Sequence, residues 1–585
     1  MTPSILNAQH FAAAQSLYQA QRLAEAEQLC RQILAQAPDH HESLHLLGVI
    51  AASCGHAAAA IELIQRAIAL RSDLPIYHLN LGMLLQQRGE LDAAMQEFER
   101  VVALEPGAAE AQNSLAVLAL LRGRLPEAAA AFERVLALQP GRADAWCNLG
   151  IALQQQGLAQ RAIAAFEQAL ALRPDYAEAA YNLGLALHRQ DRLDEAVSRL
   201  EQALSIRPDY ADAAELLGRV LHNLGIRLQD GGRPAEAIRY HERALALQPN
   251  QPVMLLSLAI GRLATGDLRA GWRDYEARWQ TPHFAAEPRR GAAPRWDGAA
   301  GSGGTILLWG EQGLGDTLHF CRYAPLVAQR GWRVLVEAPL PLVRLLRSLE
   351  GVTVVPTGTA EPAGIACYCP MLSLPLHFDT VLETIPAAIP YLEAAREDIE
   401  RWRRRCPSLW HKEPGVLTIG LCWSGNPGKD SAMVAAMNAR RAIPLDRLGP
   451  LFALRNVRFV SLQKERPPND NPAGHALIDP MPGVEDFADT AALLDALDLV
   501  ITVDTAVAHL AGALGKPVWL LNRYDSCWRW LRDRTDSPWY PTLRQFRQAA
   551  PGAWDSVIEK VAAALGAAVA GSGFRPQHQP DLTGR

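Results

Sequence analysis

The sequence predicts a helical repeat array in its amino-terminal half and a two-part α/β region in its carboxyl-terminal half. The array is indicated by small and apolar residues that recur every 34 positions. The α/β region is indicated by β-branched runs that alternate with helical segments, in two sets separated by a charged helix. At 585 residues, the chain is long enough for several domains.

Three ladders with the same period define the repeat. In the first, each position follows a leucine: Gly48, Gly82, Ala116, Gly150, Gly184 and Gly218. The second consists of alanines: Ala26, Ala60, Ala94, Ala128, Ala162 and Ala196. The third consists of prolines: Pro106, Pro140, Pro174 and Pro208. Each unit reads as two helices, because small residues allow close packing and proline closes the second helix. The pattern resembles the tetratricopeptide repeat, which implies a concave surface that holds an extended peptide or a partner helix.

The repeat register slips once. Ala196 and Ala237 are 41 residues apart instead of 34. The seven extra residues make about two helical turns, so they predict one longer helix that buries the same face. A further unit around residues 266–272 is expected to cap the array. We therefore expect the repeat array over residues 1–280 and a Pro/Gly/Ala-rich linker over residues 281–304.

The α/β region begins with a strand at Ile306–Trp309 and a helix that is expected to run through Leu326. Further strands are expected at Val334–Val336 and Val352–Val355. A charged helix at Glu393–Arg405 then separates two doubly wound, Rossmann-like halves. We expect these limits: 305–392 for the first half, 393–415 for the connecting helix, 416–565 for the second half and 566–585 for a disordered tail.

The second half contains a strand–turn–helix–strand unit over residues 498–521. The strand Leu499–Val503 stops at Asp504-Thr505, and a helix is expected from Ala506 until Gly515 ends it. The carboxyl end of such a strand and the amino end of the next helix favour an anion, because free N–H groups and the helix dipole meet there. The alternative is an ordinary unit whose Asp-Thr pair merely caps its helix.

A glycine loop follows the first strand of the first half. Gln312, Gly313 and Gly315 precede Asp316, which stands at the start of a helix. The loop lacks the third glycine of a dinucleotide fingerprint and the lysine of a P-loop. Asp316 is therefore either a helix cap or a carboxylate placed to accept a proton.

Composition limits the class of protein. The net charge of −5 argues against general binding to nucleic acid or to a membrane surface. We expect no signal peptide and no integral membrane segment, since no apolar run is long enough. The nine cysteines are scattered without the spacing of a metal site, so reduced thiols in a cytoplasmic protein are expected.

Several motifs together resemble a known type of protein. They are Glu311-Gln-Gly-Leu-Gly-Asp316, Trp423-Ser-Gly-Asn-Pro427, Arg440-Arg441, Ser461-Leu-Gln-Lys464, Asp504-Thr-Ala506 with His509, and Trp528-Arg-Trp-Leu531. Their order resembles the bacterial tetratricopeptide proteins whose carboxyl-terminal domain is a glycosyltransferase. That domain is similar to the ADP-heptose:lipopolysaccharide heptosyltransferases and implies the GT-B fold, a pair of Rossmann-like halves. The resemblance covers about residues 304–548.

The resemblance implies a nucleotide-sugar donor bound by the second half and an acceptor that faces the first. Asp316 matches the aspartate taken as the general base. Donor-binding residues are expected at Trp423, Gly425, Asn426, Arg441, Gln463, Lys464, Asp504, Thr505, Ala506 and His509. Ala506 stands where the heptosyltransferases have glycine. No Asp-x-Asp pair occurs, so we expect an inverting, metal-independent transfer without a cofactor, in which N–H groups and cationic side chains stabilise the leaving diphosphate.

The resulting hypothesis is a cytoplasmic protein glycosyltransferase. Its repeats would capture an acceptor protein, flagellin for example, and its second region would modify a Ser or Thr hydroxyl. One alternative is a transferase that acts on lipopolysaccharide or another glycan and uses its repeats for assembly. Another is a scaffold with a degenerate transferase domain. The intact Asp316 and Asp504-Thr505 weigh against the scaffold.

Overall fold

The computed structural model describes residues 3–282, 293–359, 364–425, 432–465, 470–471 and 473–571. Asn426, one of the predicted donor-binding residues, lies outside these ranges, as does most of the expected tail. By its internal contacts the chain divides into two compact units, Met1–Val220 and Leu221–Arg585. Within the described ranges, no helix is both long and apolar enough to cross a bilayer.

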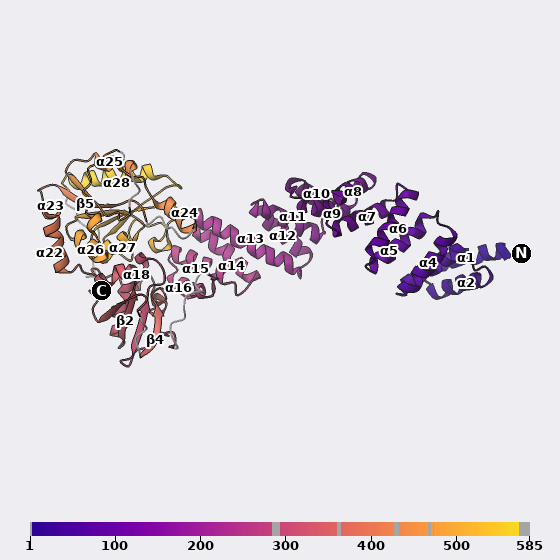
Figure 1. Ribbon diagram of the computed structural model, residues 1–585, viewed down its shortest axis with the longest axis horizontal. Coiled ribbons are helices and arrows are strands. Elements are labelled where there is room, and N and C mark those ends of the chain that lie inside the picture. The colour runs from indigo at the N-terminus through magenta and orange to yellow at the C-terminus, as the bar shows by residue number, and fades with distance from the viewer. Residues whose placement is uncertain are drawn as a thin grey trace. The chain divides into compact units, whose positions relative to one another are not determined.

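The first unit is a series of helical hairpins, in which successive helices run back and forth (Figure 1). This confirms the predicted solenoid. The helices are α1 (Pro3–Gln19), α2 (Leu23–Gln36), α3 (His41–Ser53), α4 (Ala57–Leu70), α5 (Pro75–Gln87), α6 (Leu91–Leu104), α7 (Ala109–Leu121), α8 (Leu125–Leu138), α9 (Ala143–Gln155), α10 (Ala159–Leu172), α11 (Ala177–Arg189) and α12 (Leu193–Ile206).

The glycine ladder allows the two helices of each hairpin to pack closely. A Cβ atom on Gly82 would lie 2.7 Å from the ring of Phe98, and one on Gly150 would lie 2.5 Å from the ring of Phe166. Real Cβ atoms do not approach so closely, so a larger residue would push the helices apart. The 34-residue period therefore reflects the need for a small residue where the two helices of each hairpin pack.

The predicted long helix is α13 (Ala211–Asp230). It has 20 residues, seven more than α11. The seven residues also shift the glycine contact along the chain. A Cβ atom on Gly225 would collide with the ring of His241, so Gly225 takes the role that Gly150 has in its own hairpin.

The last helices of the repeat region belong to the second unit. They are α14 (Pro234–Leu247), α15 (Pro252–Thr265), α16 (Leu268–Tyr275) and the 3-10 helix η1 (Glu276–Gln280). Trp272 and Tyr275 of α16 are buried in the same hydrophobic core as Leu308, Phe320 and Trp528. The segment that was expected to cap the array thus packs directly into the α/β region.

The first half of the α/β region has a parallel sheet with strand order β3-β2-β1-β4. The strands are β1 (Thr305–Trp309), β2 (Arg333–Ala338), β3 (Val352–Pro356) and β4 (Ile365–Pro370). Its helical segments are α18 (Leu314–Phe320), η2 (Cys321–Tyr323), α19 (Ala324–Gln329), α20 (Leu340–Leu346), η3 (Met371–Ser373), α21 (Leu374–His377) and η4 (Leu382–Thr384). The helix expected to run through Leu326 is broken, because Pro325 begins α19 as a new first turn.

The second half has a parallel sheet with strand order β6-β5-β7-β8-β9. The strands are β5 (Leu417–Cys422), β6 (Val457–Ser461), β7 (Leu499–Val503), β8 (Val518–Asn522) and β9 (Leu543–Arg547). The helical segments are α22 (Arg396–Arg405), α23 (Pro407–Trp410), α24 (Ala432–Arg441), η5 (Leu445–Leu448), α25 (Gly449–Phe452), η6 (Met481–Gly483), α26 (Phe487–Asp495), α27 (Ala506–Ala513), η7 (Trp528–Trp530) and α28 (Trp554–Val569). α28 covers one face of the sheet, and α26 and α27 cover the other (Figure 1).

Strand order locates the topological switch point of each sheet. In the first sheet the chain moves outward from β1 to β3 and then returns to the other side of β1. In the second sheet it moves from β5 to β6 and then returns to the other side of β5. Ligands of open α/β sheets bind at such switch points, at the carboxyl ends of the strands. Those ends carry the glycine loop after β1 and the Asp504 turn after β7.

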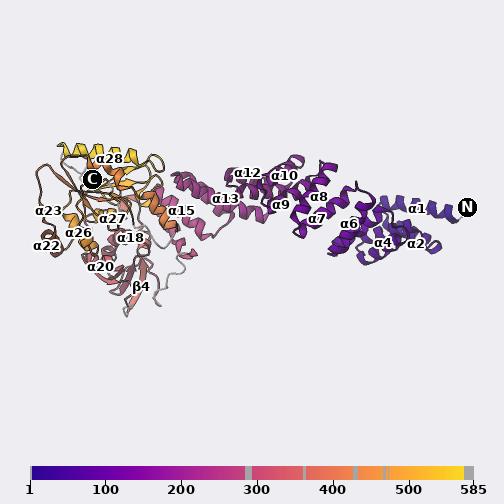
Figure 2. The same ribbon diagram turned by 45° about the horizontal axis from the view of Figure 1, so that its top comes forward.

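The two halves meet along α18 and α27, which lie side by side (Figure 2). Buried Arg322 fastens this seam by donating hydrogen bonds to the carbonyls of Trp539, at 2.7 Å, and His319, at 2.9 Å. Arg344 of α20 adds a second link through an ion pair with Asp486, at 2.6 Å. Both switch points therefore lie in the same compact unit.

Candidate active site

Asp316 lies in the first turn of α18 and has a partner on each carboxylate oxygen. Gly313 donates its backbone N–H to Oδ2 at 3.1 Å, so Asp316 caps its own helix. Its Oδ1 forms an ion pair with the guanidinium of Arg529. Each carboxylate oxygen has two lone pairs, so these contacts leave sites for a further donor. Asp316 thus caps its helix, and its side chain is still 17% exposed.

Arg529 is the partner that sequence reasoning missed. Its side chain is only 9% exposed, and its guanidinium lies 4.2 Å from the ring centre of Trp528. Burial acts to lower the pKa of Arg529, but Asp316, Cys527 and Tyr275 together outweigh it and raise this pKa overall. Arg529 therefore stays charged. A basic residue between two tryptophans was the only signal in the sequence.

The repeat region supplies a further part of this site. Tyr275 of α16 accepts a hydrogen bond from Gln312 Nε2 at 2.9 Å. Burial raises the pKa of Tyr275, so its hydroxyl stays protonated and neutral. The positive charges of Arg529 and Arg278 act to lower this pKa but do not outweigh burial. The hydrogen bond between Gln312 and Tyr275 links the glycine loop to α16, and the ion pair between Asp316 and Arg529 links α18 to the segment after β8.

The start of the glycine loop is fixed by a buried ion pair. Arg278 of η1 and Glu311 have fully buried side chains, with Nε 2.8 Å from Oε2 and Nη2 3.2 Å from Oε1. Glu311 Oε1 also accepts the N–H of Leu372 at 3.0 Å, and Arg278 donates to Ser373 Oγ at 2.7 Å. The loop is therefore held from both sides, by η1 and by the segment after β4.

The turn after β7 leaves its helix without a side-chain cap. Thr505 is the N-cap residue of α27, but its side chain does not bond to the helix. Its hydroxyl lies 3.1 Å from Thr502 Oγ1 instead. The Asp504 carbonyl accepts a hydrogen bond from Arg441 Nη1 at 2.8 Å. The alternative in which the Asp-Thr pair serves only as a cap is thus not what the structure has.

The two predicted motifs touch at Gly315. A Cβ atom there would lie 3.4 Å from Cα of Ala506 and 3.0 Å from Cδ2 of His509. The missing side chain of Gly315 therefore makes room for Ala506 at the first position of α27. This contact brings the helix that carries Asp316 to the uncapped amino end of α27.

His509 faces this seam. It is buried, its Nδ1 lies 3.0 Å from the hydroxyl of Tyr540, and its ring stacks on Trp530 with centres 5.0 Å apart. Burial, and secondarily the charges of Arg529 and Arg322, hold its pKa well below the ordinary value. His509 is therefore neutral and packs between the two halves in this structure.

The end of β5 lies beside the Asp504 turn. Gln463 Oε1 accepts the N–H groups of Trp423, at 3.2 Å, and Ser424, at 3.0 Å, which fixes the segment that leads to Gly425. A Cβ atom on Gly425 would collide with the guanidinium of Arg441. The structure thus brings Gln463, Gly425 and Arg441 together with Asp504.

The predicted residues Lys464 and Trp423, and Arg440 of the Arg440-Arg441 motif, are engaged elsewhere. The ammonium of Lys464 donates to the carbonyls of Val484 and, at 3.4 Å, Met481, which precede α26. Trp423 is buried in the core between the second sheet and α28. Arg440 forms an ion pair with Asp525 at 2.8 Å. Within the described ranges, no group of three or more His, Cys, Asp or Glu side chains is placed to hold a metal ion.

Protein-family models match parts of both the helical and the α/β regions of the chain. Models of the tetratricopeptide repeat match residues 11–75, 79–143, 141–209 and 175–250. The model of glycosyltransferase family 9 (heptosyltransferase) matches residues 483–541, which include the Asp504 turn, α27 and Arg529. The chain carries tetratricopeptide repeats and a heptosyltransferase-like domain.

A curated relative resembles part of the chain in sequence. Protein FlbA of Caulobacter vibrioides is 28% identical over an alignment of 388 positions that covers 59% of this chain and 61% of FlbA. The chain therefore spans less than two thirds of the length of this relative.

Solved structures resemble the chain only over a limited share of it. YrrB, described as a tetratricopeptide protein with an unusual peptide-binding site, is 23% identical, with a TM-score of 0.29 over 33% of this chain and 97% of YrrB. The carboxyl-terminal part of a tetratricopeptide protein from Cytophaga hutchinsonii is 16% identical, with a TM-score of 0.37 over 42% of this chain and 99% of that one. At these TM-scores neither structure bears on function.

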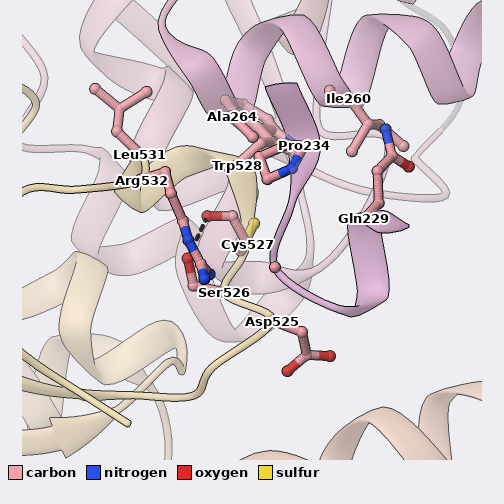
Figure 3. A pocket seen from close by; sticks show the side chains of 12 residues that line it. Gln229, Pro234, Ile260, Ala264, Asp525, Ser526, Cys527, Trp528, Leu531 and Arg532 are labelled. Atoms are coloured by element: carbon pink, nitrogen blue, oxygen red, sulfur yellow. Dashed lines mark hydrogen bonds between the residues drawn. The ribbon is translucent and has the colours of Figure 1, made fainter. Parts of the chain in front are cut away.

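A small cavity lies between the last tetratricopeptide helices and the heptosyltransferase-like domain. Its volume is about 50 Å³, and its walls include Pro234 and Ile260 on one side and Cys527 and Arg532 on the other (Figure 3). Gly232 has a left-handed backbone, with φ of +68°, and the Arg532 guanidinium occupies the space that a Cβ atom would need. The segment that carries Arg529 is thus packed against the end of the repeats.

Proposed function

We propose that the chain is a GT-B glycosyltransferase that moves a sugar from a nucleotide-sugar to a Ser or Thr hydroxyl of an acceptor protein. The observation that supports this most is the contact of Gly315 with Ala506. It places a carboxylate from one switch point next to the free amino end of a helix at the other. Sugar transfer from a nucleotide-sugar uses both, a base for the acceptor hydroxyl and a positive site for the leaving diphosphate.

The proposed reaction is a single displacement with inversion. Asp316 takes the proton of the acceptor hydroxyl while the hydroxyl oxygen forms a bond to the anomeric carbon of the sugar. The bond from that carbon to the diphosphate oxygen breaks, and the diphosphate leaves with the electron pair. The amino end of α27 and the guanidinium of Arg441 then stabilise the negative charge on the leaving group. We expect no metal and no cofactor in this scheme.

Arg529 and the repeat-derived residues would act on Asp316 as positioning residues. Arg529 holds one carboxylate oxygen and Gly313 the other, which fixes the orientation of the base. Gln312 is in turn held by Tyr275. Catalysis gains from such fixed geometry, because no reorganisation is needed when the acceptor arrives.

The tetratricopeptide repeats would bind the acceptor protein in a cytoplasmic setting. Arrays of this type present an extended concave surface to peptides and partner helices. Deleting residues 1–210 leaves the chain to begin at α13 and retains the second compact unit. We expect this variant to hydrolyse or bind the donor as the full chain does, and to lose modification of a protein acceptor. Full modification of the acceptor by the shortened chain would contradict the proposed role of the repeats.

The acceptor is identified by intact mass spectrometry of flagellin and other abundant secreted proteins, from cells with and without the gene. The proposal expects one protein to lose mass in whole sugar units when the gene is absent. An unchanged set of proteins with an altered lipopolysaccharide would favour the alternative of a glycan acceptor. No change in either would favour a scaffold.

A further inference from the structure

Besides Arg441, a second arginine lies at the sheet edge that carries the Asp504 turn. Arg523 follows β8, the parallel neighbour of β7, and the two strands are in register with Val503 opposite Leu521. Arg523 therefore leaves the sheet at the same edge as Asp504 and Thr505, one strand away. This edge is next to the switch point of the second sheet.

The guanidinium of Arg523 is buried and incompletely bonded. Its side chain is 10% exposed, and among the residues that the structure describes its Nε and Nη1 have no hydrogen-bond partner. The nearest carboxylate oxygen belongs to Asp525 and lies 3.4 Å from Nε. The other oxygen of Asp525 is occupied by Arg440 at 2.8 Å. A buried cation with free donors is costly unless a ligand completes it.

The guanidinium of Arg441 is also incompletely hydrogen-bonded. Its Nη1 is used by the Asp504 carbonyl, but its buried Nε has no hydrogen-bond partner in the described part of the chain. The positive charges of Arg441 and Arg523 act on each other: burial is the main reason that the pKa of Arg441 is lowered, and Arg523 lowers it further. Two neighbouring guanidinium groups repel unless an anion lies between them.

We infer that Arg441 and Arg523 form a two-arginine site for a diphosphate, beside the uncapped amino end of α27. Planar guanidinium groups bind phosphoryl oxygens in pairs, and helix N–H groups bind a third oxygen. This inference rests on the proposed function, because it takes the ligand to be the leaving group of the nucleotide-sugar. It adds Arg523, which no motif in the sequence singled out.

A purely structural role for Arg523 predicts a different behaviour. If the pair with Asp525 served to hold the fold, removing Arg523 would lower the melting temperature of the ligand-free protein. In a site that awaits an anion, removing the incompletely bonded cation relieves an unfavourable burial, so ligand-free stability is unchanged or higher. Asp525 would keep Arg440 as its partner in either case.

The test uses the full chain and inorganic pyrophosphate as the probe, with binding measured by calorimetry and stability by thermal unfolding. The variants are Arg523→Met and Arg523→Lys. Arg534→Met is the matched control, because Arg534 lies in the same connection and pairs with Asp536 at 2.7 Å. We expect Arg523→Met to weaken pyrophosphate binding by about tenfold or more, Arg523→Lys to weaken it less, and the control to leave it unchanged.

Several results would overturn the inference. They are no pyrophosphate binding by the wild-type chain, equal binding by wild type and Arg523→Met, or a lower ligand-free melting temperature of Arg523→Met with unchanged binding. Titrations with ADP, GDP, UDP and inorganic phosphate identify the source of the anion. The inference expects one nucleoside diphosphate to bind more tightly than pyrophosphate and inorganic phosphate to bind more weakly.

The inference and the proposed function fail in different ways. Suppose pyrophosphate binding depends on Arg523, yet no acceptor changes mass in cells that lack the gene. The anion site then stands and the transferase proposal fails. Suppose instead that gene loss removes the sugar and Arg523→Met restores it fully, with wild-type pyrophosphate affinity. The transferase proposal then stands and the two-arginine site is wrong.

Discussion

The two sheet edges of the α/β region differ in how completely their polar groups are paired. At the first edge, Glu311 is matched by Arg278, Gln312 by Tyr275 and Asp316 by the ion pair with Arg529, although Nε of Arg529 is also buried without a hydrogen-bond partner in the part of the chain that the structure describes. At the second edge, α27 begins without a side-chain cap, and guanidinium nitrogens of Arg441 and Arg523 lack partners within the described ranges.

This difference suggests a division of labour. A side chain that must meet a reacting hydroxyl benefits from a fixed position, which the paired edge supplies. A surface that binds a highly charged ligand benefits from donors that only the ligand completes, as at the second edge. The structure thus favours a base on the repeat side and an anion on the other. The predictions below test this contrast, from the largest expected effect to the smallest.

Asp316→Asn is expected to have the largest effect. The amide cannot accept the proton of the acceptor hydroxyl, so transfer should fall by about a hundredfold or more. Donor binding should survive, because the donor contacts lie on the second edge. Rates of sugar transfer and donor affinity are measured side by side. The control is Asp379→Asn, an exposed carboxylate of the same half that pairs with Arg269. Near-normal turnover by Asp316→Asn would show that another group is the base.

Arg278→Met is expected to destabilise the second unit strongly. The change leaves the carboxylate of Glu311 buried without its cation, which typically costs about 3–5 kcal/mol in the free energy of unfolding. Urea denaturation measures this loss. Arg269→Met removes an exposed ion pair and should have little effect. Equal effects of the two substitutions would mean that the glycine loop is not anchored by η1.

The seam between the halves should make stability sensitive to acid. His319 and His509 are buried with ring centres 5.1 Å apart, and burial, together with Arg322 and Arg529, lowers the pKa of each below its ordinary value. A lowered pKa in the folded state means that the stabilisation is complete above the unfolded pKa of about 6.5 and is lost as pH falls below it.

His319→Phe isolates this effect. Among the residues that the structure describes, neither ring nitrogen of His319 has a hydrogen-bond partner, and the ring contacts Phe320 and Trp539, so phenylalanine should fit. We expect the variant to lose less stability than wild type between about pH 6.5 and 5, as measured by unfolding at each pH. An unchanged pH dependence would exclude His319 as a source of it.

Tyr275→Phe should have the smallest effect. It removes the hydroxyl that accepts from Gln312 and retains the ring that packs on Trp272 and Trp528. A single hydrogen bond of this kind is worth about 0.5–1.5 kcal/mol. Tyr323→Phe is the control, since its hydroxyl bonds to Thr380 instead. If Tyr275 positions the base, its substitution lowers kcat and the control does not. Equal kcat values would assign Tyr275 to packing alone.

The local patterns of the sequence predicted most of the fold. The small residues of each hairpin and the seven extra residues of α13 are visible because they recur or break a period. The strand, turn and helix around Asp504 are visible because β-branched runs and Gly515 mark their ends, and Gly515 has the left-handed φ of +73° that ends a helix.

The sequence could not show the pairs that complete the site. Arg278 and Glu311 are 33 positions apart, and neither belongs to a repeating pattern that links them. Arg529 meets Asp316 only because α18 and α27 pack together, and His509 turns toward the seam for the same reason. Lys464 was predicted from its motif alone, and it bonds to carbonyls before α26 because β6 carries it to that side.

The most direct test of the account replaces the chromosomal gene with the Asp316→Asn form and measures the intact masses of the secreted proteins. The account predicts the same loss of whole sugar units as in cells without the gene, with the variant protein at wild-type abundance. Cells that carry Asp379→Asn should retain the sugar. A fully modified acceptor in the Asp316→Asn cells would contradict the assignment of the base, and with it the division of labour between the two sheet edges.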